Sequence, residues 1–450
     1  MVTAKTMRFL RADKAAILLC TVISLCGAAM SDASLAAQVD DAERQFDDAE
    51  RQFYEAELLW LGGDLASATA AFETIVDQFP KTTHPNVVWR AAARVRVAEI
   101  DLRSGRADAA ATAFVTTIED EPISPWTSRA QVGLARVLQQ RREWEASTEL
   151  LQSVVAAADT DADAVDPEAV ASARRWLGLM HRMWVRPAMG LSPWEISGRA
   201  PIGGEPLDNP IAVASSPDGT LLISDEGAKV VIMVNPSQPD SLTRVPEEEA
   251  RRPWWDLDGL PYVAIKGGVL MPQDQVRAQF PDPQRPDRAL ENIVAGARGL
   301  AGEWILVSDR NKSVANISAD GSSLATLPLL GEAPEPVDLA TDTYGWLYII
   351  DGDSRGVHRF SPDGVYQGGL ASVSWEEPYA LDVDALGNIY VLDRRAKKID
   401  VFDSDGVSRW SLGPVLPGGV ELRDPRDVAV DGQGRIYVAD RNLSVVVMIQ

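Results

Sequence analysis

The strongest constraint on the fold of this chain is a short segment that recurs five times in its second half. "GRIYVADRN" (434–442) is echoed by "GNIYVLDRR" from 387, "GWLYIIDGD" from 345, "GEWILVSDRN" from 302 and "GTLLISDEG" from 219. Each copy joins a glycine turn to a short apolar strand and a polar turn. Recurrence at a fixed period indicates stacked or radial units, because one such unit cannot bury its apolar face alone.

The spacing inside and between the copies is regular. A proline precedes the aspartate of four copies by 15 residues, at Pro210 and Asp225, Pro336 and Asp351, Pro378 and Asp393, and Pro425 and Asp440. Successive aspartates are 42, 42 and 47 residues apart from Asp309 through Asp351 and Asp393 to Asp440. The interval from Asp225 to Asp309 is 84 residues, which predicts a hidden unit between them.

The segment "PWWDLDGLPYVAIKGG" (253–268) fits this hidden unit. Pro253 would begin it, 262–265 would form its apolar strand, and Lys266 or Gly267 would replace the aspartate. Six units of about 42 residues with four short strands each predict a six-bladed β-propeller.

The repeated segment resembles the NHL repeat, and the resemblance covers roughly residues 191–450. It implies an NHL-like propeller over 189–450. The chain ends at "VVVMIQ", the third strand of its last blade, whereas "PWEISGRAPIG" (193–203) is a strand without a blade. We therefore predict that strand 193–203 completes the sixth blade and removes its exposed edge.

The repeated glycines and aspartates are interpreted as structural. Glycines such as Gly219 turn the chain at positive φ, and each aspartate can accept hydrogen bonds from the backbone of the following turn. The aspartates concerned are Asp225, Asp309, Asp351, Asp393 and Asp440. A residue needed once per blade serves the fold, so function is expected where the blades differ.

Residues 37–188 carry a helical repeat. Gly63, Leu65, Ala68, Phe72 and Pro80 recur with the spacing of Gly105, Ala107, Ala110, Phe114 and Pro122, and a weaker third copy has Arg142, Trp144, Ser147 and Leu151. This pattern resembles the tetratricopeptide repeat, which implies a short α-solenoid whose groove binds a peptide or partner helix. A helical spacer remains the alternative. The fold class is therefore a multidomain chain with a solenoid and a propeller.

Residues 1–36 are typical of a signal peptide. Four basic residues precede the apolar run 15–30, and Ser34 and Ala36 supply the small residues of a cleavage site. Export to the periplasm, the cell envelope or the exterior is expected, with no membrane span in the mature chain. Cys20 and Cys26 each follow a leucine, where a lipid-attachment motif needs a small residue, so we expect no lipid anchor. The net charge of −23 argues against a nucleic-acid partner.

The predicted ligand surface is a basic face of the propeller. The turns between second and third strands and the loops before first strands emerge on one face, called the loop face below. It would receive Arg310, Lys312, Arg355, Arg394, Arg395, Lys397, Arg426 and Arg441. Such a surface suits a protein or peptide partner or an anionic glycan. The alternative is that each base pairs with a neighbouring acid.

No set of catalytic residues, cofactor motif or metal site is evident, and a non-catalytic binding scaffold is the preferred function. Related propellers include peptide-amidating lyases, which hold zinc with histidines, but His358 is the single histidine of this half. Others, similar to gluconolactonases, hold a divalent metal with carboxylate and amide groups. The alternative function is thus a propeller hydrolase or lyase, which requires three or four such side chains to converge in the channel.

Overall fold

The computed structural model describes residues 48–60, 64–79, 87–120, 124–181 and 207–449, apart from 163, 257–258, 301, 320, 330–333, 363, 371–373 and 418. The chain folds as two compact units that divide at Leu177 and Gly178. The predicted signal peptide and the predicted domain boundary at 188–189 lie outside the described residues. No helix within the described ranges is long and apolar enough to cross a membrane.

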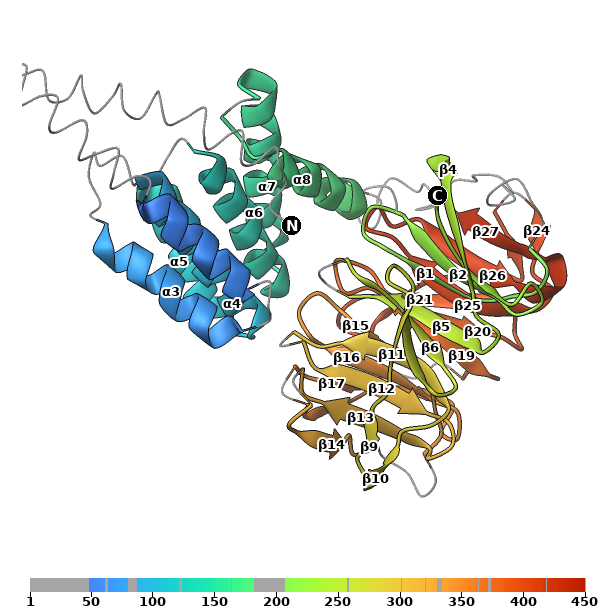
Figure 1. Ribbon diagram of the computed structural model, residues 1–450. Helices are drawn as coiled ribbons and strands as arrows, with labels where there is room; N and C mark the ends of the chain where they lie inside the picture. Colours follow the sequence, from blue (N-terminus) through green and yellow to red (C-terminus); the bar gives the residue numbers. More distant parts are fainter. Residues whose placement is uncertain are drawn as a thin grey trace, which may run out of the picture. The chain divides into compact units, whose positions relative to one another are not determined.

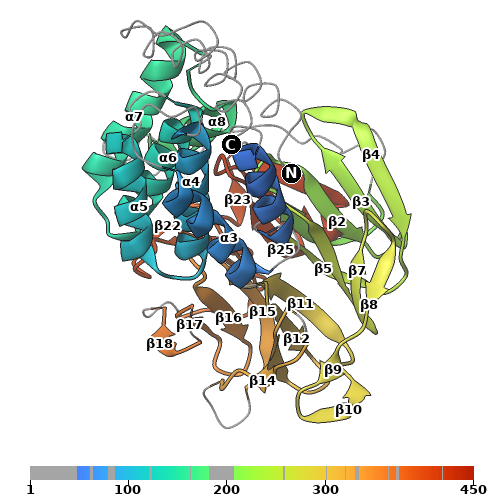
Figure 2. The same ribbon diagram turned by 60° about the vertical axis from the view of Figure 1, so that its left-hand side comes forward.

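The first unit consists of seven helices in the part of the chain that the structure describes, as the sequence predicted. Helix 48–60 is followed by α3 (Leu65–Gln78), α4 (Val87–Arg103), α5 (Ala107–Asp120), α6 (Pro125–Gln140), α7 (Trp144–Thr160) and α8 (Pro167–Met180). From α3 to α7 each helix packs against the next in the sequence (Figures 1 and 2). Consecutive packing of this kind is consistent with a repeat solenoid.

The repeated residues of the helical unit occupy equivalent places. The small residues Ala68, Ala110 and Ser147 and the large residues Phe72, Phe114 and Leu151 are all fully buried. Gly105 has φ +74° in the turn before α5, and Arg142 has φ +64° in the turn before α7. Arg142 therefore adopts the left-handed conformation for which the second copy uses Gly105. The third copy keeps the turn although it lacks its usual residue.

Close helix contacts and an aromatic cluster form the core of this unit. A Cβ added to Gly133 of α6 would lie 2.3 Å from the Phe114 ring of α5, so these two helices approach at a glycine. Phe53 is buried against the rings of Phe72, Trp89 and Trp126, with centroids 5.3, 5.3 and 5.8 Å away.

The second unit is a six-bladed β-propeller, as predicted. Its blades are β1–β4 (Pro210–Ser215, Leu221–Asp225, Val230–Asn235, Gln238–Pro246), β5–β8 (Ala250–Trp255, Pro261–Ile265, Gly268–Met271, Val276–Ala278), β11–β14 (Ile293–Arg298, Trp304–Ser308, Ser313–Ile317, Leu324–Thr326), β15–β18 (Pro336–Thr341, Leu347–Asp351, Gly356–Phe360, Tyr366–Gly369), β19–β22 (Pro378–Val383, Ile389–Asp393, Lys398–Phe402, Ser408–Leu412) and β25–β27 (Pro425–Val430, Ile436–Asp440, Val445–Ile449). Two short ribbons, β9–β10 (Pro281–Asp282, Arg285–Ala289) and β23–β24 (Val415–Leu416, Val420–Glu421), connect blades. Every strand pair is antiparallel between sequence neighbours, so the colours change smoothly within each blade in Figure 1.

Strand register confirms the repeat in four blades and corrects it in two. The proline that begins the first strand pairs with the aspartate that ends the second, as in Pro210 with Asp225. In the second blade the pair is Ala250 with Ile265, so the predictions of Pro253 and of Lys266 or Gly267 were wrong by a few residues. Pro253 and the pair Lys266–Gly267 match the repeat in residue type. The positions that correspond to the proline and the aspartate of the other blades are instead occupied by the apolar residues Ala250 and Ile265.

The third blade contains a second correction. Ile293 pairs with Ser308, so Ser308, and not Asp309, occupies the aspartate position. Its hydroxyl donates to the Glu291 carbonyl at 2.8 Å and accepts the Asn311 N–H at 3.3 Å. A serine therefore replaces the carboxylate as the residue that holds the turn.

The other four aspartates hold the chain as predicted. Asp393 accepts N–H groups of Glu376 and Glu377 before the first strand and of Ala396 in the following turn. Asp225, Asp351 and Asp440 make the corresponding bonds. Each carboxylate thus ties two loops of its own blade together on the loop face.

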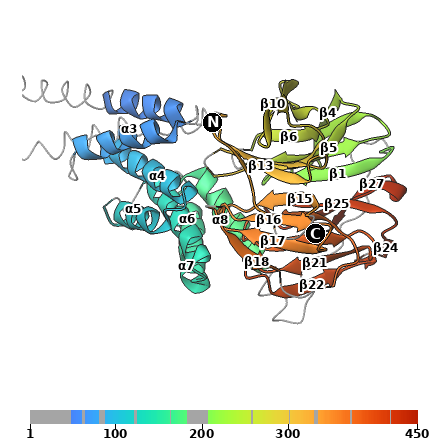
Figure 3. The same cartoon turned by 90° about the horizontal axis from the view of Figure 1, so that it is seen from below.

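The ring brings the first and last blades into contact. Strand β1 packs beside β25, and both lie near the ring closure in Figure 3. The last blade has three strands within the described ranges and ends with β27, as the sequence predicted. The strand predicted to complete it, 193–203, lies outside the described residues.

Candidate functional site

The structure places seven of the eight predicted basic residues in turns between second and third strands, and Arg426 at the second position of β25. Six of them form ion pairs: Arg310 with Glu291, Lys312 with Glu335, Arg394 with Glu377, Arg395 with Glu376, and both Arg426 and Arg441 with Asp424. Pairing with a neighbouring acid therefore describes most of this face. The exposed pairs contribute little to stability and lower the surplus positive charge.

Arg355 and Lys397 differ from the other six. Neither forms an ion pair with any residue that the structure describes, and Arg355 is exposed while Lys397 is half-buried. Both occupy the last position of their turns, with φ +50° and +54°. On the predicted surface, Arg355 and Lys397 are therefore the two bases whose positive charge is not neutralised by an ion pair with a described residue.

Arginine side chains pack around Tyr379, the second residue of β19, at the mouth of the propeller channel. The guanidinium carbons of Arg252 and Arg394 lie 4.8 and 4.7 Å from its ring centroid. Burial of Arg426 alone would lower its pKa, but its hydrogen bond to Asp424 and the influence of Tyr379 raise the pKa above its usual value. The Nε atom of Arg426 is buried without a hydrogen-bond partner among the described residues. The sequence predicted Arg394 and Arg426 for the ligand surface but gave no sign of Arg252 or Tyr379.

Arg252 of the second blade crosses the channel. Its Nη2 donates to the Tyr379 carbonyl at 2.7 Å and its Nη1 to the Val337 carbonyl at 3.3 Å. Its Nε lies 3.3 Å from the Asp338 carboxylate and 3.5 Å from that of Asp427. One side chain from the irregular blade therefore contacts the fourth, fifth and sixth blades.

Three aspartates from consecutive blades line the same channel: Asp338 and Asp427 are buried, and Asp382 is half-buried. Each carboxylate accepts the N–H of the following residue and an N–H of the next blade. The inter-blade bonds run to Asp338 from Leu381 (2.9 Å), to Asp382 from Val430 (2.7 Å) and to Asp427 from Val213 (2.9 Å). The aspartates therefore join the fourth blade to the fifth, the fifth to the sixth, and the sixth to the first.

The channel holds more acidic than basic groups. The guanidinium of Arg252 lies near the carboxylates of Asp338 and Asp427, and the carboxylate of Asp382 is the third acidic group. Burial raises the pKa of Asp382 to about 8, and the charges of Asp427 and Asp338 add to this rise. Burial likewise raises the pKa of Asp427 to about 7 and that of Asp338, although Arg252 acts in the opposite direction. The pKa of Arg252 rises despite burial because of Asp338 and Asp427. The carboxylates line a cavity of about 100 Å³.

The channel chemistry differs from that of an open metal site. Both oxygens of Asp338 and of Asp382 accept main-chain N–H groups. Within the described ranges, no group of three or more histidine, cysteine or acidic side chains is arranged to hold a metal ion. The three carboxylates can link neighbouring blades through hydrogen bonds, and their raised pKa values allow them to bind protons in the folded protein. Asp338, Asp382 and Asp427 were not predicted from the sequence, because each lies within an otherwise mainly apolar segment, "PVDLA", "YALDV" and "RDVAV". The aspartate inside each strand is the signal that could have identified them.

His358, the single histidine of the propeller, lies in the third strand β17 as predicted. Its Nε2 is 3.6 Å from the Asp351 carboxylate and 3.3 Å from the Ser354 hydroxyl. It faces the β17–β18 side of its blade, where its ring packs 5.8 Å from that of Tyr366.

A larger hollow of about 870 Å³ lies on the loop face between the first two blades. The second blade has only Lys266 and Gly267 between β6 and β7, whereas the first has four residues between β2 and β3. Three glutamates on its rim pair with bases: Glu247 with Arg277, Glu248 with Lys229 and Glu249 with Lys266. The hollow is thus a consequence of the short turn, and its rim charges are paired.

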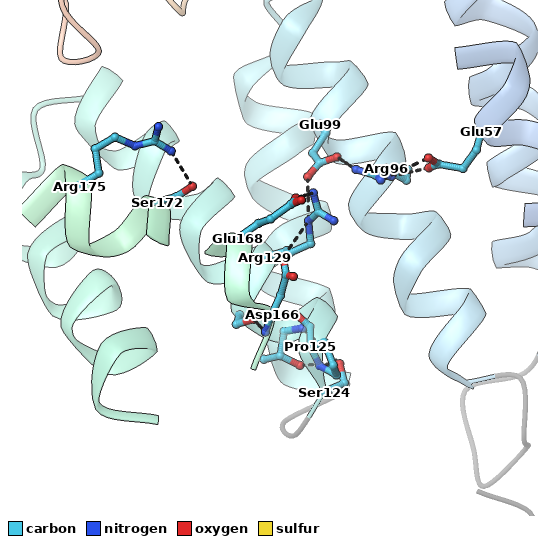
Figure 4. Close-up of polar contacts among 12 residues, drawn as sticks. Glu57, Arg96, Glu99, Ser124, Pro125, Arg129, Asp166, Glu168, Ser172 and Arg175 are labelled. Atoms are coloured by element: carbon cyan, nitrogen blue, oxygen red, sulfur yellow. Dashed lines mark hydrogen bonds and ion pairs between the residues drawn. The ribbon is translucent and has the colours of Figure 1, made fainter. Parts of the chain in front are cut away.

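The first helices of the helical repeats share a chain of ion pairs. Arg96 of α4 lies between Glu57 and Glu99, 2.6 Å from each, as Figure 4 shows. Arg129 of α6 continues the chain with Glu99 at 3.8 Å, Asp166 at 3.5 Å and Glu168 at 3.4 Å. Burial alone would raise the pKa of Glu99, but Arg96 and Arg129 hold it below its usual value. The chain links the helix 48–60 to α4, α6 and the start of α8.

Comparison with known proteins agrees with the propeller. The family model described as NHL repeat matches residues 422–442, which include β25, β26 and the loop before them. No curated protein matches the chain.

Solved structures of similar fold include both enzymes and a binding protein. A virginiamycin B lyase from Staphylococcus aureus is 12% identical over 55% of this chain and 85% of its own, with TM-score 0.39. A gluconolactonase from Xanthomonas campestris is 15% identical (57% and 93% covered, TM-score 0.44), and an auxiliary nutrient binding protein from Bacteroides thetaiotaomicron is 10% identical (54% and 69%, 0.43). At these identities and TM-scores, the likeness carries no argument about the function of this chain. This chain carries an NHL repeat within a six-bladed β-propeller, preceded by a helical region consistent with a repeat solenoid.

Proposed function

We propose that this protein is an exported, non-catalytic binding scaffold whose propeller binds its ligand at the loop face around Tyr379. The observation that supports this most is the state of the channel. Arg252 bonds to three blades across it, and Arg394 lies over the ring of Tyr379. Arg426 and Arg441 share the carboxylate of Asp424. Arginine and tyrosine in a partly desolvated cluster are typical of binding hot spots.

The alternative, a hydrolase or lyase with a carboxylate-bound metal, has less support. Carboxylates from three blades do converge in the channel, as that alternative requires. Their oxygens, however, accept main-chain N–H groups, and Arg252 already supplies a positive charge between Asp338 and Asp427. A divalent metal would have to displace both sets of bonds, which buried carboxylates give up only at a large cost.

The proposed setting follows from the predicted signal peptide 1–36, which would deliver the protein to the periplasm, the cell envelope or the exterior. The solenoid supplies a second surface for a protein partner. Its inner charges already pair with one another in the chain from Glu57 to Glu168, so we expect contacts there to depend on shape and apolar groups more than on charge.

The test compares the mature protein with an Arg394→Gln, Arg441→Gln variant for capture of partners from envelope extract. Loss of a specific partner by the variant, with an unchanged thermal transition, supports the loop face. An Arg174→Gln variant in α8, whose base forms an exposed ion pair with Asp159, is the control and should retain the partner.

The same preparations are assayed for lactone hydrolysis with added divalent metals and for metal retained after dialysis. Turnover that needs a metal and disappears in an Asp382→Ala variant would overturn the binding proposal in favour of the enzyme.

A further inference from the structure

Four blades place a basic residue at the last position of the turn between the second and third strands. Lys229, Lys312, Arg355 and Lys397 occupy this position with φ between +47° and +54°. A left-handed conformation costs an L-residue with a Cβ about 1 kcal/mol and favours glycine or asparagine. The backbone conformation of the turn thus does not explain why a lysine or arginine occupies its last position. We therefore look for an explanation in the charge of these side chains.

Two of these four bases pair with the next blade. Lys229 of the first blade lies 3.1 Å from Glu248, which precedes the second, and Lys312 of the third lies 3.2 Å from Glu335, which precedes the fourth. In both cases the acid immediately before a blade neutralises the base of the blade that precedes it. The pairs therefore work as charge links between neighbouring blades.

The acids that would serve Arg355 and Lys397 are already engaged. Glu376 and Glu377, before the fifth blade, pair with Arg395 and Arg394 of that same blade. Asp424, before the sixth blade, pairs with both Arg426 and Arg441. Arg355 and Lys397 consequently have no ion-pair partner among the residues described, on two adjacent blades.

These facts define a surface, the 4–6 sector, composed of Arg355, Arg394, Lys397, Arg426 and Arg441. It combines two unpaired cations with two arginines that share one carboxylate, and with a buried Arg426 Nε that lacks a partner among the described residues. Such a surface offers several charge-assisted donors at once and thus suits a ligand with several carboxylates. The other three bases of the predicted surface, Arg310, Lys312 and Arg395, each pair with one acid and do not suit such a ligand.

We propose that the 4–6 sector binds an acidic peptide segment of a partner protein; this rests on the proposed function of the loop face. A peptide is favoured over an anionic glycan because sugar rings bind through stacking on open aromatic faces. Tyr379, the aromatic ring of this sector, is instead covered by Arg252 and Arg394. Aspartate and glutamate side chains need only the donors that the sector supplies.

The test measures binding of a fluorescein-labelled hexaglutamate peptide by fluorescence anisotropy, with hexaglutamine as the uncharged control. An Arg355→Gln, Lys397→Gln variant should weaken hexaglutamate binding about tenfold, because two unpaired donors are lost. The matched control is Lys229→Gln, Lys266→Gln, which removes the same charge from the same face at bases that pair with Glu248 and Glu249. It should change the affinity less than about twofold.

Three outcomes overturn the proposal. Equal weakening in both variants would show attraction to overall charge without a site. Binding of an oligogalacturonate, but not of hexaglutamate, would assign the sector to a glycan. Absence of binding to either probe, while the Arg394→Gln, Arg441→Gln variant still loses its captured partner, would reject the acidic peptide and leave the proposed function standing. Thermal unfolding of each variant checks that its fold is retained.

Discussion

The Asp427 carboxylate accepts a hydrogen bond from the Val213 N–H at 2.9 Å across 214 residues of sequence. The bond joins the innermost strands of the last and first blades, where the ring must close. Asp427 also lies 3.5 Å from Arg252, which reaches it from the second blade. Closure of the propeller therefore depends on a buried polar group as well as on strand packing.

Arg252 is predicted to be the most sensitive residue of the channel. Its replacement by methionine keeps the side-chain volume but leaves Asp338 and Asp427 without a cation. Removing one partner of a buried ion pair costs about 3–5 kcal/mol, and urea unfolding of the propeller measures it. An unchanged midpoint would mean that the two carboxylates are neutral in the folded protein.

Arg252 and Asp427 should act as a coupled pair. A double-mutant cycle with Arg252→Met and Asp427→Ala is expected to give a loss smaller than the sum of the single losses by about 1 kcal/mol or more. Strict additivity would contradict the contact between them.

The stability of the propeller should fall as the pH rises from about 4 to about 8. The pKa of Asp382 is raised to about 8 by burial, above its unfolded value. Between about pH 4 and pH 8 the folded state therefore binds more protons than the unfolded chain, and the free energy of unfolding decreases with rising pH. Thermal unfolding between pH 5 and pH 9 measures the slope.

An Asp382→Ala variant separates the two roles of this carboxylate. It should lose about 1–3 kcal/mol at pH 6, because the Val430 N–H remains buried without an acceptor. Its stability should also vary less between pH 6 and pH 9 than that of the wild type. A variant with the full wild-type slope would assign the titration to Asp427 or Asp342, whose pKa values are each raised to about 7.

Two glycines of the helical region, which runs from the helix 48–60 to α8, allow a direct test of backbone conformation. No atom lies within 4 Å of a Cβ added to Gly105 or to Gly178, but only Gly105 has positive φ. Gly105→Ala should destabilise the solenoid by about 1 kcal/mol, whereas Gly178→Ala, inside α8, should stabilise it by about as much. Thermal unfolding followed by circular dichroism distinguishes the two; a loss in both variants would contradict the explanation.

The predicted closure of the sixth blade by strand 193–203 is tested by hydrogen exchange of β27. If that strand pairs with β27, removal of residues up to 203 should speed exchange of the Val445–Ile449 amides and lower the thermal midpoint of the propeller. Equal exchange in the full chain and the shortened one would contradict the pairing.

The fold was largely predictable because repetition carries it. Glycine turns, apolar strands and the spacing from proline to aspartate gave the number of blades and the unfinished last one. The errors fell where the repeat is irregular: Ile265 and Ser308 took positions that the sequence seemed to assign to Lys266 or Gly267 and to Asp309. A motif fixes the average register of strands, whereas a single blade can shift by a residue if its neighbours still pack.

The candidate site was predictable only in part. The sequence placed eight bases on the loop face, because the position of a turn follows from the strands around it. It could not distinguish the bases that form ion pairs from those that do not. Lys312 pairs with the acid before the next blade, whereas the acids that could pair with Arg355 and Lys397 pair with other arginines instead.

The sequence by itself determined the two kinds of repeat, helical and β-stranded, the number of blades and the residues at which the chain turns. These features depend on the spacing of residues that are close in the sequence. The tertiary structure decided that Arg252 meets Asp338 and Asp427, and that Asp427 meets Val213. Those contacts join blades far apart in the chain. They exist only once the ring has closed, because a closed propeller brings the innermost strands of all its blades to one axis.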